Sequence, residues 1–183
     1  MTESHLTEPP VAGNEADTLV GSLERMRRTF IWKASSGVDA AGLRATTAAS
    51  SMTLGGLIKH ISLVEDDYFS HRLWGNDYQP LWNVDWDSDP DWEWRTAADD
   101  SPEELLALWT ETVARSRALI SKALTEGGGL DRPQVYTWSD GRTPTLRRML
   151  VDIIEEYARH TGHADIIRES VDGLVGEDPP SEA

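Results

Sequence analysis

The sequence predicts an all-α fold in which four helices pack as a bundle. Four segments of about 20 residues carry apolar side chains at helical spacing, and capping or stop residues mark their ends. At 1.5 Å per residue, each helix would be about 30 Å long, which is typical of a bundle. The chain of 183 residues is also long enough for one domain that buries about two thirds of its unfolded surface.

Local signals set the ends of the four helices. The helices are predicted over residues 14–34, 53–74, 102–124 and 145–170. Gly37 stops the first helix. Ser101 caps the third helix, with Pro102 in its first turn and Glu104 completing a capping box. The fourth helix is followed by Gly173.

The bundle is predicted to cover residues 15–172, with a tail at each end. Residues 1–14 are polar and contain two prolines and a glycine, and residues 173–183 are acidic and contain a second Pro pair. Neither stretch can bury enough apolar surface to order itself, so both tails are predicted to be disordered.

Two connections are longer than a minimal bundle needs, about residues 75–100 between the second and third helices and about 127–144 between the third and fourth. Aromatic density in the first connection argues against disorder, so we expect it to pack over one end of the bundle. It holds Trp82, Trp86, Trp92 and Trp94. These side chains are interpreted either as a lid over a substrate or as anchors that fix the loop to the bundle.

Composition and charge exclude several classes of function. Lys and Arg number 17 against 32 Asp and Glu, and the resulting net charge of −15 opposes binding to nucleic acid and to membranes. The absence of cysteine excludes disulfides, thiolate metal ligands and a protein thiol nucleophile. Any thiol chemistry therefore needs a thiol brought from outside.

The sequence also favours a location and leaves the oligomeric state open. The N-terminus has neither a basic nor an apolar segment of the kind found in signal peptides, and no run of 18 apolar residues occurs. These features predict a cytoplasmic protein. Because most soluble oligomers are symmetric pairs, a homodimer is compatible with the sequence, although no residue indicates one.

The fourth predicted helix places two candidate metal ligands beside its apolar stripe. Turning by 100° per residue puts Glu156 and His160 next to the core and about 6 Å apart, whereas Glu155 faces water. A carboxylate at such a position needs an ionic partner, a hydrogen bond or a metal ion. The spacing of four suits two ligands of one ion, and His60, at the edge of the second helix's stripe, is the best candidate for a third.

Other interpretations of these residues stay open. His163, one turn further along, is either an alternative ligand to Glu156 or a neighbour of the site. His71 lies about 16 Å along the helix axis from His60, too far for the same ion. A histidine on an apolar face is also more often a hydrogen-bonded core residue, in which case Glu156 would pair with an arginine. The candidate arginines are Arg115 on the third helix, or Arg147 or Arg148 of another molecule.

Three stretches of sequence carry a family resemblance: TLGGLIKHISLVEDDYF at 53–69, VDWDSDPDWEWRTAADDSPEELLALW at 84–109 and IIEEYARHTGHADIIRE at 153–169. They resemble the DinB-like four-helix metalloprotein superfamily and, more narrowly, its branch related to mycothiol-dependent transferases and maleylpyruvate isomerases. This resemblance, which covers about residues 15–172, implies one divalent metal ion held by His60, Glu156 and His160. It places His163 beside the metal.

The resemblance implies an enzyme that transfers the small thiol mycothiol to a small electrophile. Three protein ligands with an open fourth position are typical of a catalytic zinc site, although nickel, iron and manganese accept the same ligands. Two alternatives stay open: a bundle that binds a metal or a small molecule without turnover, and a metal-dependent hydrolase. The hydrolase would need a base, for which Asp67, Asp152 and His163 are candidates. No catalytic residue is assigned.

Overall fold

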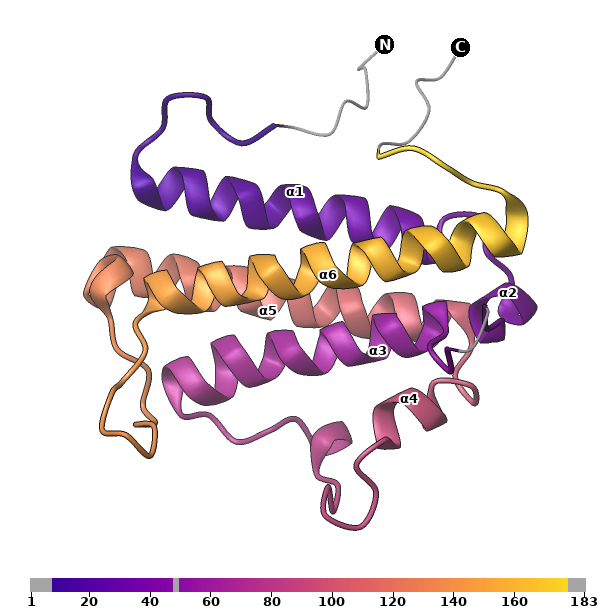
Figure 1. Cartoon of the computed structure of the whole chain (residues 1–183). Coiled ribbons are helices and arrows are strands. Elements are labelled where there is room, and N and C mark those ends of the chain that lie inside the picture. The colour runs from indigo at the N-terminus through magenta and orange to yellow at the C-terminus, as the bar shows by residue number, and fades with distance from the viewer. Residues whose placement is uncertain (1–7, 48–49, 178–183) are drawn as a thin grey trace.

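The computed structural model describes residues 8–47 and 50–177, in which four long helices lie side by side (Figure 1). The long helices are α1 (Glu15–Ser35), α3 (Leu54–Glu65), α5 (Pro102–Glu126) and α6 (Leu146–Asp172). Between them lie the short segments α2 (Ala40–Arg44), η1 (Asp66–Arg72), η2 (Pro80–Trp82), α4 (Trp92–Thr96) and η3 (Gly129–Asp131). No β-strand occurs among the described residues. The predicted all-α bundle, with its two long connections, is confirmed.

The helix ends follow from the local signals in the sequence. At the start of α5, the Ser101 hydroxyl accepts a hydrogen bond from the Glu104 backbone at 3.2 Å, and the Glu104 carboxylate accepts one from the Ser101 backbone at 2.8 Å. Gly173 closes α6 with a φ of 76°, a conformation that favours glycine. These capping contacts set the first residue of α5 and the last residue of α6.

The second predicted helix differs from expectation in its last third. The prediction of one α-helix over 53–74 is wrong there, because η1 is a π-helix in which the Leu73 backbone donates to the Tyr68 carbonyl, five residues back. Apolar periodicity did not reveal this change, since Phe69 and Leu73 stay buried through the wider turn. Segments of π-helix often lie at functional sites.

A buried polar network joins all four long helices. Arg27 of α1 donates from its Nε and a terminal nitrogen to the two carboxylate oxygens of Glu65, next to η1, at 2.8 and 2.7 Å. Tyr157 of α6 donates to the same carboxylate at 2.8 Å, and Trp109 of α5 donates to the Tyr157 hydroxyl at 3.2 Å. Apolar side chains surround this network in one continuous core.

The tryptophan-rich connection lies beside α3, not over one end of the bundle as expected (Figure 1). Two glycines at the start of α3 explain this placement, because they let α4 approach closely. A Cβ on Gly56 would lie 2.9 Å from the Trp94 ring, and one on Gly55 would lie 3.6 Å from the Ala97 carbonyl. Trp82 is 1% exposed, as an anchor of the connection must be.

The predicted tails extend beyond the described part of the chain. Residues 1–7 and 178–183 lie outside it, so the expected disorder stays a prediction. Pro9 and Pro10 lie against α1, where a Cβ on Gly21 would come within 2.8 Å of the Pro10 ring. Within the described ranges, no helix is both long and apolar enough to cross a membrane.

Candidate metal centre

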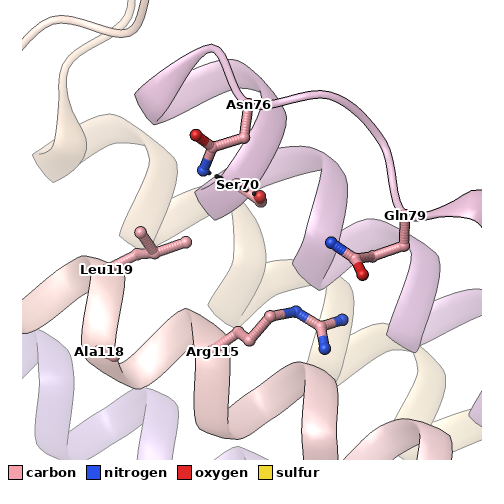
Figure 2. Close-up of a pocket in the computed structure, with 6 residues that line it drawn as sticks. All are labelled: Ser70, Asn76, Gln79, Arg115, Ala118 and Leu119. Atoms are coloured by element: carbon pink, nitrogen blue, oxygen red, sulfur yellow. Dashed lines mark hydrogen bonds between the residues drawn. The ribbon is translucent and has the colours of Figure 1, made fainter.

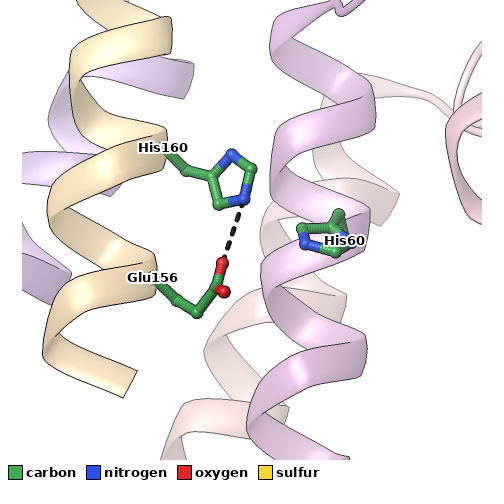
Figure 3. Close-up of side chains that lie close together, drawn as sticks. All are labelled: His60, Glu156 and His160. Atoms are coloured by element: carbon green, nitrogen blue, oxygen red, sulfur yellow. Dashed lines mark ion pairs between the residues drawn. The ribbon is translucent and has the colours of Figure 1, made fainter. Parts of the chain in front are cut away.

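His60, Glu156 and His160 converge in the space between α3 and α6 (Figure 3). Each offers one ligand atom, and these three atoms all lie within 4.8 Å of one another. His60 comes from α3 and the other two from α6, one turn apart. The structure therefore brings together the three residues that the sequence analysis singled out.

The two glutamates that follow one another on α6 have different environments. The Glu155 side chain is exposed, whereas Glu156 is 32% exposed and has an oxygen 3.2 Å from Nε2 of His160. This difference agrees with the helical-wheel expectation. Because Glu156 lies at the edge of the core and not within it, its desolvation cost is lower than a fully buried carboxylate would carry.

The arginines offered as alternative partners of Glu156 bind other carboxylates. Arg147 pairs with Glu15 and Asp131, Arg148 pairs with Asp152, and Arg115 lies 3.6 Å from Asp66. Within residues 8–47 and 50–177, no Lys or Arg is paired with the Glu156 carboxylate, whose close charged-type contact is with the imidazole of His160. The interpretation of Glu156 as half of an arginine salt bridge is thus unsupported.

His160 is held in the form that binds metals. Burial, together with the nearby His60, His163 and Arg159, lowers the pKa of His160 to about 4. The imidazole is therefore neutral at pH 7, with a lone pair free for an ion. Nδ1 of His160 lies 3.2 Å from Nδ1 of His163, so Nε2 is the nitrogen on the side of Glu156. This contact places His163 next to the three-residue cluster and not within it.

His60 is enclosed by two neighbouring residues of α4. The Trp94 ring stacks on the imidazole with centroids 4.6 Å apart and planes 23° apart. A carboxylate oxygen of Glu93 lies 3.3 Å from Nδ1 of His60. Sequence reasoning named Trp94 as a lid or anchor residue and not as a neighbour of His60, and it missed Glu93. Helical periodicity carries no information on a contact between residues 33 positions apart.

The chemistry and spacing of the three side chains fit a divalent ion. Two imidazoles and a carboxylate are typical ligands of zinc in catalytic sites, and they also accept nickel, iron or manganese. Two ligand atoms that each lie about 2.1 Å from one ion are at most about 4.2 Å apart. The three atoms here lie within 4.8 Å of one another, so small side-chain movements would bring them to bonding distance of one ion. A four-coordinate ion would then keep one position for water or substrate.

The other titratable residues considered in the sequence lie outside this cluster. His71 stacks between Tyr78 and Tyr136, with centroids 4.0 and 4.8 Å away. Asp67 accepts a hydrogen bond from the Tyr78 hydroxyl at 2.7 Å. Asp152 binds Arg148 at 2.6 Å, and burial raises the pKa of the Asp152 carboxyl. Neither aspartate is placed among the candidate metal ligands.

A cavity of about 290 Å³ lies elsewhere, between η1, the following loop and α5 (Figure 2). Its lining residues are Ser70, Asn76, Gln79, Arg115, Ala118 and Leu119. None of these residues belongs to the His60–Glu156–His160 cluster. The cavity is therefore separate from the candidate metal centre.

Comparison with known families adds independent information to this geometry. The sequence model of the mycothiol-S-transferase family matches residues 18–173. The chain belongs to this family. The match covers α3, α5, α6 and all but the first three residues of α1, and it includes all three clustered residues. It confirms the resemblance drawn from the sequence. No curated protein matches the chain. Since the family is one of enzymes that act with a thiol substrate, the His60–Glu156–His160 cluster is the candidate catalytic site.

Proposed function

We propose that this chain is a divalent-metal-dependent transferase that joins mycothiol to a small electrophile. The convergence of His60, Glu156 and His160 between α3 and α6 carries the proposal, because it places a metal-binding set in a chain of the mycothiol-S-transferase family. Each of the three residues acts as a ligand. With no cysteine in the sequence, the reacting sulfur belongs to the substrate.

The site's task is to make a thiol nucleophilic near neutral pH. A free cysteine-type thiol has a pKa of about 8.5, so most of it carries its proton at pH 7. A bound divalent ion supplies positive charge that favours the thiolate. The chain supplies the negative charge of Glu156 and the neutral imidazole of His160, which hold such an ion without displacing a proton from His160.

The reaction follows from the nature of the two substrates. With an alkyl chloride such as monochlorobimane, the sulfur of mycothiol forms a bond to carbon, the carbon–chlorine bond breaks, and chloride and the thiol proton leave. Holding sulfur and carbon together in one site lowers the barrier by orienting them. The proton acceptor is water or buffer in this proposal, and we assign no residue as a base.

Zinc is the ion that we propose first. We also propose that Trp86, Trp92 and Trp94, but not the buried Trp82, flank the substrate. Mycothiol carries a sugar and an inositol, which pack well on indole faces. Trp86 and Trp92 are half-buried and lie edge to face, 6.1 Å apart, so part of each remains available. Trp94 is half-buried and stacks on His60, so it lies directly beside the candidate metal centre.

Metal analysis together with a rate assay tests the proposal. Purified protein should contain about one divalent ion per chain and should conjugate mycothiol to monochlorobimane faster than the uncatalysed reaction. His60→Ala, Glu156→Gln and His160→Ala should each lower metal affinity tenfold or more. Glu155→Gln removes the same charge from the exposed neighbour and should leave both metal content and rate unchanged.

Three outcomes would overturn the proposal. Stoichiometric metal binding without turnover would indicate a binding protein. Metal-dependent cleavage of substrates without added thiol would indicate a hydrolase. Conjugation that persists unchanged in metal-free protein and in all three variants would separate the activity from this cluster.

A further inference from the structure

Two adjacent residues of α4 enclose the imidazole of His60. Glu93 contacts its edge, with Oε1 3.3 Å from Nδ1, and Trp94 covers its face at a centroid distance of 4.6 Å. Glu93 is 6% exposed, and its other oxygen, Oε2, is buried without a hydrogen-bond partner among the described residues. A carboxylate has thus been taken out of water at this position.

Among the described residues, no Lys or Arg is paired with the Glu93 carboxylate. Lys59, the basic residue next to His60 in the sequence, donates instead to Asp100 at 2.6 Å and lies over the Trp92 ring at 4.6 Å. In the part of the chain that the structure describes, His60 is the side chain that pairs with Glu93. Burial of a carboxylate is costly unless a hydrogen bond or a nearby positive charge compensates for it.

The placement of α4 is built into the start of α3. Gly56 leaves room for Trp94, since a Cβ there would lie 2.9 Å from Cε3 of the ring. One turn later, Lys59 binds Asp100, just beyond the end of α4. Glu93 is therefore held against His60 by contacts of the residues on either side of it: Trp92 lies under the Lys59 ammonium, and Trp94 packs at Gly56. A fixed supporting residue requires such contacts.

We infer that Glu93 is a positioning residue for the metal centre. Its carboxylate accepts a hydrogen bond from Nδ1–H of His60, which leaves Nε2 of His60 to bind the ion. This inference rests on the proposed metal site. A carboxylate on the far nitrogen fixes the tautomer and the ring orientation, and it makes the ligand nitrogen more basic. A bound ion also polarises the imidazole, and the resulting attraction offsets part of the cost of burying the Glu93 carboxylate.

The two histidines of the site differ in their supporting partners. His60 faces the carboxylate of Glu93, whereas His160 faces the imidazole of His163, which carries no permanent negative charge. His60 is consequently the more electron-rich of the two ligands. Loss of Glu93 should weaken metal binding more than loss of His163.

Metal titration of two Glu93 variants tests the inference on the full-length protein. Glu93→Leu removes the acceptor and the charge, and we expect metal affinity, measured by competition with a chelator for Zn²⁺, to fall by about tenfold to a hundredfold. Glu93→Gln keeps an acceptor oxygen, so its metal affinity should fall less than that of Glu93→Leu. Asp87→Asn removes a charge from an exposed position of the same connection and should change nothing.

A spectroscopic measurement separates ligand positioning from general destabilisation. At saturating Co²⁺, the visible absorption bands of the Glu93 variants should shift from those of the parent, because the donor strength of His60 has changed. A merely structural role for Glu93 would lower thermal stability and leave the spectrum of the loaded protein in place.

The outcomes for the metal site and for Glu93 are distinct. If the parent binds no divalent ion, the proposed metal site fails whatever Glu93 does. If the parent binds an ion and Glu93→Gln and Glu93→Leu bind it with parental affinity and an unchanged Co²⁺ spectrum, the inference about Glu93 is wrong. Should Glu93→Leu fail to fold, the same criteria applied to the isosteric Glu93→Gln decide.

Discussion

Two polar clusters lie between the same helices and are built in opposite ways. In the buried network, Arg27, Glu65 and Tyr157 are fully buried, and every charged group has a partner of opposite sign or a hydrogen bond. In the candidate metal centre, the side chains of His60 and Glu156 are 21% and 32% exposed, and no Lys or Arg of the described chain is paired with the Glu156 carboxylate. The clusters are close in sequence, since Glu156 directly precedes Tyr157.

The contrast shows which cluster is complete without a ligand. Arg27 balances Glu65, and burial beside the Glu65 charge raises the pKa of Tyr157 well above its ordinary value, so that its hydroxyl keeps the proton it donates. The metal centre instead brings together a carboxylate and a neutral imidazole with an unshared lone pair. In the proposed metal site, a divalent cation would supply the positive charge that this second cluster lacks.

The largest expected effect comes from breaking the complete network. Arg27→Met leaves the buried Glu65 carboxylate without its cation, so the free energy of unfolding should fall by about 3–5 kcal/mol. Urea unfolding followed by circular dichroism measures the loss. The double variant Arg27→Met with Glu65→Gln removes both charges and should recover much of it, whereas a loss below about 1 kcal/mol in the single variant would show that the pair is not held as described.

Metal removal should affect the other cluster and not the network. At a zinc concentration about 100 times the dissociation constant, the parent should gain about 2.7 kcal/mol of stability over its metal-free form. At the same zinc concentration, a tenfold or greater loss of affinity should reduce this gain in Glu156→Gln to about 1.4 kcal/mol or less. Its metal-free stability should change by less than about 0.5 kcal/mol because the side chain is partly exposed. Thermal melting with and without metal measures both. An equal gain in Glu156→Gln would exclude Glu156 as a ligand.

Removing one hydroxyl from the network should have an intermediate effect. Tyr157→Phe deprives the Glu65 carboxylate of one hydrogen bond and leaves Nε1 of Trp109 without its acceptor, at a cost of about 2 kcal/mol. Metal affinity should stay within about twofold of the parent, although Tyr157 adjoins Glu156. Tyr136→Phe, at an exposed position, is the matched control for stability. A tenfold loss of metal affinity would mean that the two clusters are coupled.

The sequence predicts the metal centre better than the network, for a physical reason. Spacing of four on one helix brings Glu156 and His160 to the same side, and the edge position of His60 makes it the matching partner on another helix. Local capping likewise predicts the helix ends, as at Ser101. These features depend on residues within a few turns of one another.

What the sequence did not reveal depends on contacts between distant segments. Arg27 and Glu65 are 38 residues apart, and Glu93 and His60 are 33 apart, so no local periodicity relates them. The path of the connection along α3 is set by the small volume of Gly55 and Gly56, whose effect depends on what packs there. Such contacts follow only from the assembled fold.

The smallest expected effect concerns the partner of His160. If Nε2 of His160 binds the ion, its Nδ1 carries the proton and donates to Nδ1 of His163, which is 3.2 Å away. His163→Leu removes this acceptor, but the position is half-buried and water can replace it, so metal affinity should fall only about threefold to tenfold. His163→Gln keeps an acceptor and should lose less, as measured by the same chelator competition. A loss of a hundredfold or more in His163→Leu would instead make His163 a direct ligand, which is the alternative that the sequence left open.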